Sequence, residues 1–148
     1  KCDSLAHLLS ESHFVSIHCV LNDETLMLIG ETELRIMKPD AILINSARGA
    51  IIDEQALVRA VKEKWIAGLG LDVFSLEPLN RENHPMRSLL DCPNVILSPH
   101  LTFYTEGAMK RLETETLERC FEFLEGRNIL IKSEDPRLRA QTERVVFL

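Results

Sequence analysis

The sequence has few of the features that mark nucleic-acid-binding or membrane-spanning proteins. Aromatic residues make up only 5% of its 148 residues, and 23 acidic residues outnumber 17 basic ones, which gives a net charge of -6. No basic stripe runs through the chain, so a nucleic-acid partner is not expected. No apolar run approaches the roughly 18 residues of a membrane-spanning helix, so a membrane partner is not expected either.

The sequence also lacks paired cysteines and metal-binding histidine motifs. No CxxC pair occurs, and the strand and helix patterns around the cysteines are typical of an intracellular enzyme, not of a disulfide-stapled secreted domain. We therefore predict reduced thiols and a cytoplasmic location for a chain with Cys2, Cys19, Cys92 and Cys120. No metal site is predicted, because HxxxH and HExxH spacings are absent among His7, His13, His18 and His84.

Four short apolar segments rich in β-branched residues predict a parallel sheet. They are nearly continuous in apolar character, as strands buried on both faces should be; they are Phe14 to Val20, Ala41 to Asn45, Ile66 to Val73 and Val95 to Leu97. Helical patterns precede or separate the strands, at Asp3 to Leu9, Glu31 to Met37 and Glu54 to Lys64, with Asp53 as a candidate N-cap. This alternation predicts an α/β fold with a three-layer, Rossmann-like parallel sheet and flanking helices.

Two longer segments follow the third predicted strand, and their sequence patterns predict a loop and an amphipathic helix. Residues Phe74 to Pro93 are predicted to form a loop with one short turn around Met86 to Leu90, and loops longer than about 12 to 15 residues are often functional. Thr105 is expected to cap a long amphipathic helix that runs to about Leu124 and closes at Gly126. Its expected buried positions are Met109, Leu112, Leu117, Phe121 and Leu124.

Three residues with charged or titratable side chains each follow a predicted strand. Arg48 follows AILINSA, Glu77 follows LGLDVFSL and His100 follows NVILSP. Ligands of open parallel sheets bind beyond the carboxyl ends of the strands, so the three are candidates for one site. An arginine can grip a carboxylate, and a carboxylate can orient a histidine that moves a proton. Taken singly, each also has a structural interpretation, as a carbonyl cap, a solvated loop acid and a packed histidine.

Four blocks of the sequence carry a family resemblance. The blocks are VSIHCVLNDET, LRIMKPDAILINSARGAIIDEQALVRAV, IAGLGLDVFSLEP and NVILSPHLTFYTEGA. In this order and spacing the chain, from about Leu5 to Glu125, resembles the D-2-hydroxyacid dehydrogenases, NAD-dependent enzymes that act on small 2-hydroxy and 2-oxo acids. The resemblance implies an oxidoreductase, with a homodimer formed through the cofactor domain.

The resemblance also implies residue roles. Arg48 matches the arginine that holds the substrate carboxylate, His100 matches the catalytic acid/base, and Glu77 matches the acid that hydrogen-bonds that histidine. Asp72 matches a residue at the nicotinamide end of the cofactor. The other cofactor-lining positions, besides Arg48 and His100, are His18, Cys19, Ser46 and Ala47.

One family feature does not occur in the sequence: the GxGxxG dinucleotide fingerprint between a strand and a helix. Only six glycines are present, and Gly68 and Gly70 lie inside a predicted strand. We therefore expect residues 1–125 to be the nicotinamide half of an NAD-binding domain with its C-terminal helix, residues 126–148 to be a tail, and the start at Lys1 to be cut from a longer chain. NAD versus NADP stays open.

Two functions remain at this point. The first is reduction of a small 2-oxo acid to a D-2-hydroxy acid with NAD(H) as hydride carrier and His100 as acid/base. The second is a non-catalytic binding or dimerisation module derived from the same family, because the fingerprint and the substrate domain are absent. The presence of Arg48, Glu77 and His100 together favours the first.

Overall fold

A computed structural model describes residues 1–79, 82–131 and 145–147 of the chain. These residues form two compact units, Lys1–Thr102 and Phe103–Leu148, and each is described by itself. The first unit contains every candidate site residue. No helix of the described ranges is both long and apolar enough to cross a membrane.

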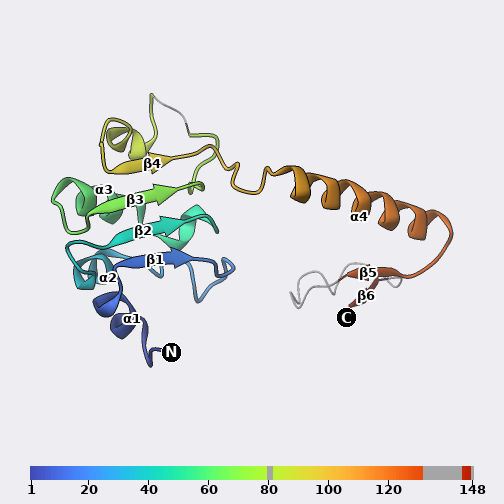
Figure 1. Ribbon diagram of the computed structural model, residues 1–148, viewed down its shortest axis with the longest axis horizontal. Coiled ribbons are helices and arrows are strands. Elements are labelled where there is room, and N and C mark those ends of the chain that lie inside the picture. Colours follow the sequence, from blue (N-terminus) through green and yellow to red (C-terminus); the bar gives the residue numbers. More distant parts are fainter. Residues whose placement is uncertain (80–81, 132–144, 148) are drawn as a thin grey trace. The chain divides into compact units, whose positions relative to one another are not determined.

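The first unit is built on a four-stranded parallel sheet in the order β1-β2-β3-β4 (Figure 1). The strands are β1 (Phe14–Ile17), β2 (Ile42–Asn45), β3 (Gly68–Leu71) and β4 (Val95–Leu97). All adjacent pairs are parallel, so the four carboxyl ends meet at one edge. The predicted α/β fold with a parallel sheet is therefore confirmed, although three of the strands are shorter than the apolar segments that predicted them.

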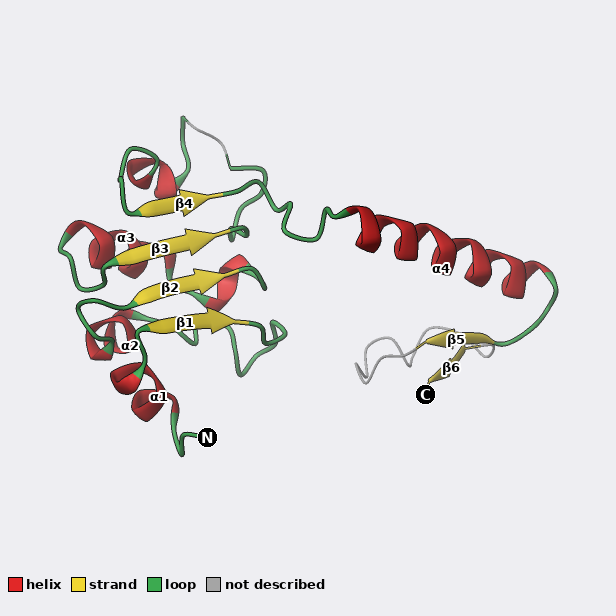
Figure 2. Cartoon of the chain, viewed as in Figure 1, coloured by secondary structure: helices red, strands yellow, loops and turns green. Residues whose placement is uncertain are grey.

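Short helices precede the first strand and connect the others (Figure 2). The α-helices of this unit are α1 (Leu5–Glu11), α2 (Glu31–Ile36) and α3 (Glu54–Lys62), and two 3-10 segments are η1 (Gly49–Ile51) and η2 (Pro85–Leu89). The Asp53 carboxylate caps α3, as predicted, by accepting hydrogen bonds from the N–H groups of Gln55 and Ala56 at 2.9 and 3.2 Å. Such a cap satisfies backbone donors that have no partner inside the helix.

The helices and the inward side chains of the strands share one hydrophobic core. Burial alternates along β1, where Val15 and Ile17 are buried while Phe14 is 71% exposed. On β4, Ile96 is 74% exposed. The expectation of burial on both sheet faces is therefore wrong for this unit, because α1, α2 and α3 all pack on the face formed by Val15, Ile17, Leu43, Leu69 and Leu71.

The second unit consists of a long helix and a pair of short strands. Helix α4 (Glu106–Leu124) begins at the predicted cap, since the Thr105 hydroxyl accepts a hydrogen bond from the Ala108 N–H at 3.2 Å. Its end is also as predicted, with Gly126 in the left-handed region at φ 69°. Strands β5 (Ile129–Ile131) and β6 (Val145–Phe147) pair in parallel within the expected tail, of which residues 132–144 and 148 lie outside the described residues.

The predicted buried face of α4 is not buried. Leu112, Leu117, Phe121 and Leu124 are 55%, 52%, 58% and 77% exposed, and Met109 is only partly buried. The amphipathic pattern correctly predicted a helix with one apolar face. The expectation of burial was wrong because no described residue of the second unit covers that face.

Candidate active site

The loop after β2 is shaped by a buried asparagine at the end of the strand. The Asn45 side chain, 1% exposed, donates to the Arg48 carbonyl at 2.8 Å and accepts from the Ala47 N–H at 3.0 Å. These two bonds fold residues 46–48 into a tight turn at the carboxyl edge of the sheet. The exposed Arg48 side chain leaves this turn and donates from Nη1 to the Ala47 carbonyl at 2.6 Å.

Gly49 brings the Arg48 turn against the loop that carries Glu77. Gly49 is buried, and a Cβ atom placed on it would lie 2.0 Å from the Phe74 carbonyl carbon and 2.3 Å from the Ser75 nitrogen. No side chain fits in that space, so the two backbones are in direct contact. The positions of Arg48 and Glu77 are therefore linked although 29 positions separate them in the sequence.

Glu77 and His100 form the central pair of the site. The Glu77 Oε2 atom lies 2.7 Å from His100 Nδ1, and Glu77 Oε1 accepts a hydrogen bond from the Phe74 N–H at 2.9 Å. Burial by itself raises the pKa of Glu77, but the bonds from His100 and Phe74 outweigh it and hold that pKa below its ordinary value. Glu77 is thus an acceptor, which places a hydrogen on His100 Nδ1 and makes Nε2 the ring nitrogen that can exchange a proton.

Asp72 fixes the backbone on which His100 stands. Its carboxylate, 3% exposed, accepts four hydrogen bonds from residues that flank the histidine. The donors are the Ser98 hydroxyl (2.6 Å), the Leu101 N–H (2.9 Å), the Thr102 N–H (2.9 Å) and the Thr102 hydroxyl (2.7 Å). Burial raises the pKa of Asp72, yet these four bonds together hold it far below its ordinary value. Asp72 is therefore ionised at neutral pH, and its carboxylate clamps residues 98–102.

The clamp maintains an unusual backbone conformation. His100 has a φ of 56°, in the left-handed region that costs most side chains energy. Non-glycine residues held in this region cluster at functional sites, where the surrounding structure compensates for the strain. Here the bonds from Ser98, Leu101 and Thr102 to Asp72 supply that compensation on both sides of His100.

A cavity of about 330 Å³ adjoins the pair and is lined by Phe74, Glu77, Pro78, Leu79, Pro99 and His100. Its mixture of apolar walls and one imidazole–carboxylate pair suits a small polar ligand. Arg48 lies at the same sheet edge but does not line this cavity, and no hydrogen bond joins it to Glu77 or His100 among the described residues.

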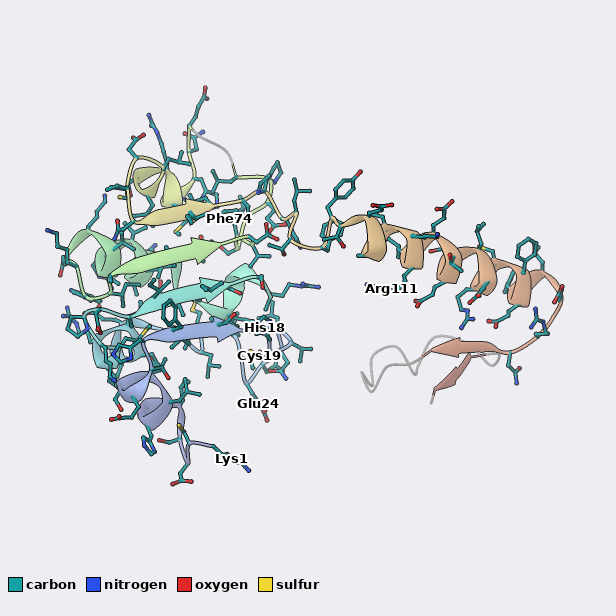
Figure 3. The ribbon with its side chains drawn as sticks, viewed as in Figure 1. Lys1, His18, Cys19, Glu24, Phe74 and Arg111 are labelled. Atoms are coloured by element: carbon teal, nitrogen blue, oxygen red, sulfur yellow. The ribbon has the colours of Figure 1, made fainter. Side chains whose placement is uncertain are left out.

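The remaining candidate residues lie at the ends of β1 and β2. His18 and Cys19 follow β1 and are exposed (Figure 3), and the His18 ring is 2.7 Å from the Ser16 hydroxyl. Ser46 and Ala47 are half-buried in the turn after β2. These four residues are therefore accessible at the same edge as His100. Across the described residues, no group of three or more potential ligand side chains is placed to hold a metal ion.

Sequence reasoning missed several residues that shape the site, notably Asn45, Gly49, Ser98 and Thr102. A signal existed for two of them, since hydroxyl residues stand two positions before and after His100. Nothing local in the sequence shows that both donate to Asp72, which is 26 to 30 positions away. The role of Gly49 likewise depends on a contact that forms only in the folded chain.

A parallel sheet with an ionised carboxylate and a histidine at its carboxyl edge places these side chains where open α/β sheets bind their ligands. Residues 1–102 match the family model described as "D-isomer specific 2-hydroxyacid dehydrogenase, NAD binding domain". The chain belongs to this family.

Individual relatives agree with the family model. A glyoxylate reductase from Aeropyrum pernix is 48% identical over 124 residues, covering 84% of this chain and 36% of that protein. A D-isomer specific 2-hydroxyacid dehydrogenase from Lactobacillus delbrueckii ssp. bulgaricus, solved with NAD, superposes with a TM-score of 0.74 at 33% identity, covering 82% of this chain and 40% of that one.

A third relative was solved with both a cofactor and an acid. It is a D-lactate dehydrogenase from Aquifex aeolicus, complexed with NAD and lactic acid; it superposes with a TM-score of 0.76 at 34% identity and covers 83% of this chain and 40% of that one. The chain thus spans a little over a third of the length of the curated relatives that it matches.

Proposed function

We propose that the protein to which these residues belong is an NAD-dependent D-2-hydroxyacid dehydrogenase that reduces a small 2-oxo acid. The observation that carries this proposal is the 2.7 Å bond between Glu77 and His100 at the carboxyl edge of the sheet, in a chain of this family. The glyoxylate and lactate named in the relatives give the size class of the substrate. A non-catalytic module is not favoured, since it would have no use for a strained and clamped histidine.

His100 is the acid/base of the proposed reaction. With Nδ1–H held by Glu77, Nε2 is the nitrogen that gives a proton to the carbonyl oxygen in reduction and takes it back in oxidation. Because Glu77 stays ionised, it stabilises the protonated ring before the transfer. The hydride that reaches the carbonyl carbon is supplied by the nicotinamide cofactor when it is bound.

Arg48 is the residue proposed to bind the substrate carboxylate. Its guanidinium offers several donors in a planar fork that matches a carboxylate and does not lose its charge. One donor is used on the Ala47 carbonyl, which keeps the side chain at the sheet edge. The contact between Gly49 and Phe74 fixes the distance between this turn and the loop of Glu77.

The residues at the carboxyl edge fit the nicotinamide end of NAD. Ligands of such sheets bind beyond the strand ends, and His18, Cys19, Ser46 and Ala47 lie there with accessible surface. Asp72 is assigned to the same end of the cofactor, where its four hydrogen bonds hold residues 98–102, the loop that carries His100. We propose NAD, the cofactor named with both solved relatives described above.

The organisation of the chain follows from this assignment. Residues 1–125 would be the nicotinamide half of the cofactor domain with its C-terminal helix, and residues 126–148 a tail. We further propose a homodimer formed through the cofactor domain and, because Cys2, Cys19, Cys92 and Cys120 are all free, a cytoplasmic location. Sedimentation of the full-length protein and cell fractionation test these two assignments.

The decisive test is His100→Asn in the full-length protein. Loss of the positioned acid should lower kcat for glyoxylate reduction by roughly 10² to 10⁴, the usual contribution of such a group, while NADH binding is retained. The absorbance of NADH gives the rate and its fluorescence gives the binding. His13→Asn, at an exposed histidine that pairs with Asp40, is the matched control. Unchanged turnover in His100→Asn would remove the proposed function.

A further inference from the structure

Glu77 stands in a loop, so no regular element holds its side chain in place. Residues 74–77 follow β3 without forming helix or strand. Yet the Glu77 carboxylate must remain within hydrogen-bond distance of His100, and a misplacement of about 1 Å at such a contact can cost about 10²-fold in rate. The side chains that fix the backbone of this loop therefore deserve a functional assignment.

The first such side chain is His84, which the catalytic proposal does not use. It is only 6% exposed. Its Nε2 donates to the Leu76 carbonyl at 3.1 Å, and its Nδ1 accepts from the Met86 N–H at 3.1 Å. The ring also packs edge-on against Phe74, with centroids 5.8 Å apart. His84 thus joins the start of η2 to the residue immediately before Glu77.

The second is Glu54, at the start of α3. Its Oε1 atom accepts a hydrogen bond from the Ser75 N–H at 2.7 Å. Together with Ser75 and Leu76, Glu54 and His84 line one cavity of about 190 Å³. The two side chains therefore reach the same stretch of loop from two different elements, α3 and η2.

Three consecutive residues of the loop are held through their backbone. The Phe74 N–H is bound by Glu77 itself, the Ser75 N–H by Glu54 and the Leu76 carbonyl by His84. Backbone polar groups of an irregular loop are usually left to water. Here side-chain anchors replace that water just ahead of the carboxylate that binds His100.

We propose that His84 and Glu54 are positioning residues for the Glu77–His100 pair. Neither contacts His100; each acts by fixing the backbone that sets the Glu77 carboxylate. This inference rests on the proposed function, since it assigns the two residues to the step in which His100 exchanges a proton. It predicts that loosening the loop lowers kcat more than it changes KM, in variants that remain folded.

Two substitutions separate the bonds of His84. In His84→Asn, the short amide can still accept from the Met86 N–H, because asparagine is a good N-cap, but it does not reach the Leu76 carbonyl. In His84→Gln, the amide nitrogen reaches the position of Nε2 and can donate to that carbonyl. We expect His84→Asn to lower kcat roughly 10- to 100-fold and His84→Gln to retain most of it, with both variants folded by circular dichroism.

Glu54 gives an independent pair. Glu54→Gln keeps an acceptor for the Ser75 N–H and should keep most of kcat, whereas Glu54→Ala removes the acceptor and should lower kcat. Gln55→Ala, at the exposed neighbour in the same helical turn, controls for effects on α3. Equal kcat in His84→Asn, His84→Gln and wild type would overturn the assignment of His84, and equal kcat in both Glu54 variants would overturn that of Glu54.

A spectroscopic measurement separates this inference from the proposed function. Nitrogen-15 chemical shifts of the imidazoles report whether His100 keeps its hydrogen on Nδ1, the signature of the bond to Glu77. We expect this signature in wild type and His84→Gln, and its loss in His84→Asn. If His100→Asn abolishes turnover while His84→Asn changes neither kcat nor this signature, the positioning role fails and the function stands. If His100→Asn leaves turnover intact, the proposed function fails. The nitrogen-15 signature in the His84 variants then still tests whether His84 positions Glu77 against His100.

Discussion

Two buried residues of this site, Asn45 and Asp72, position its side chains by forming hydrogen bonds to the backbone of neighbouring loops. Asn45 shapes the Arg48 turn, and Asp72 clamps both sides of His100. Each is almost fully buried, at 1% and 3% exposure, where an unmet polar group is costly. Their substitution should therefore affect both stability and the geometry of the site.

The pH dependence of stability should contain a contribution from Asp72. The pKa of this group in the folded protein is far below the value of about 3.9 for a free aspartate. Above about pH 4 the folded anion is stabilised in full, and this contribution is lost as the pH falls further. Asp72→Asn should lower the free energy of unfolding at pH 7 by about 2 to 4 kcal/mol, because the amide removes the buried charge that these bonds stabilise and offers one acceptor oxygen in place of two.

Urea denaturation at pH 7 and pH 3 measures this effect. The difference between wild type and Asp72→Asn should shrink at the lower pH, because the wild type loses part of what the variant already lacks. Asp91→Asn, at an exposed aspartate of the same unit, is the control and should show the same small difference at both values. A pH-independent effect of Asp72→Asn would contradict the clamp.

The close contact at Gly49 gives a second prediction at this scale. In Gly49→Ala the new methyl group would overlap the Phe74 backbone at 2.0 Å, so the Arg48 turn or the Glu77 loop must move. We expect a loss of about 1 to 3 kcal/mol in unfolding free energy, typical of overpacking, with reduced turnover. In Gly70→Ala the nearest atom would be a side-chain carbon of Ile44 at 3.7 Å, so little change is expected. Equal stability of the two variants would refute the contact.

Among the elements, α3 and α4 both end in a Schellman motif, but a different residue type occupies its left-handed position in each helix. After α3, the Trp65 N–H binds the Ala60 carbonyl and the Lys64 N–H binds the Val61 carbonyl, with Lys64 at φ 59°. After α4, Gly126 takes the equivalent place at φ 69°. This Schellman motif favours glycine, because other residues are strained there. Lys64 therefore costs α3 stability that Gly126 does not cost α4.

Lys64→Gly should relieve that strain. We expect a gain of about 0.5 to 1 kcal/mol in unfolding free energy. Glycine removes the cost of the left-handed conformation, and its greater freedom in the unfolded chain offsets part of that gain. Lys62→Gly, two residues earlier and within α3, should lose a similar amount because it weakens the helix. Thermal or urea unfolding of both variants provides the comparison, and a loss in Lys64→Gly would show that the lysine side chain contributes contacts outweighing the strain.

At the scale of the whole molecule, the first unit presents one covered and one open sheet face. Phe14 and Ile96 are 71% and 74% exposed on the open face, and β1 is an edge strand. Exposed apolar surface next to an unpaired strand edge favours association with other chains. The family relatives are more than twice as long as this chain, so in them more protein is available to cover such surfaces.

The 148-residue chain should therefore self-associate at micromolar concentration. Replacing Phe14 and Ile96 together by threonine keeps residues suited to strands while it removes apolar area, so the double variant should sediment more slowly. Val20→Thr, at an exposed position in the loop after β1, should not have this effect. Sedimentation velocity across a concentration series decides, and a wild-type chain that remains monomeric throughout would contradict the expectation.

The sequence determined the architecture because its information is local and periodic. Apolar runs of β-branched residues predicted all four parallel strands, while Asp53 and Thr105 predicted the starts of α3 and α4. The same runs are nearly continuous in apolar character and so predicted burial on both sheet faces, yet Phe14 and Ile96 are exposed, because the packing of other segments decides which face is covered. For the same reason the apolar positions of α4 predicted a helix but not its burial.

The sequence also predicted that Arg48, Glu77 and His100 lie at one sheet edge, since each follows a parallel strand and such strands end together. Of the three, Glu77 and His100 are joined by a hydrogen bond, whereas the Arg48 side chain bonds to the Ala47 carbonyl. Only the tertiary structure decided how they are held. The four bonds to Asp72, the contact of Gly49 with Phe74 and the braces from His84 and Glu54 join residues brought together by the fold. Distances between such residues depend on how strands and loops pack, and no local pattern in the chain encodes them.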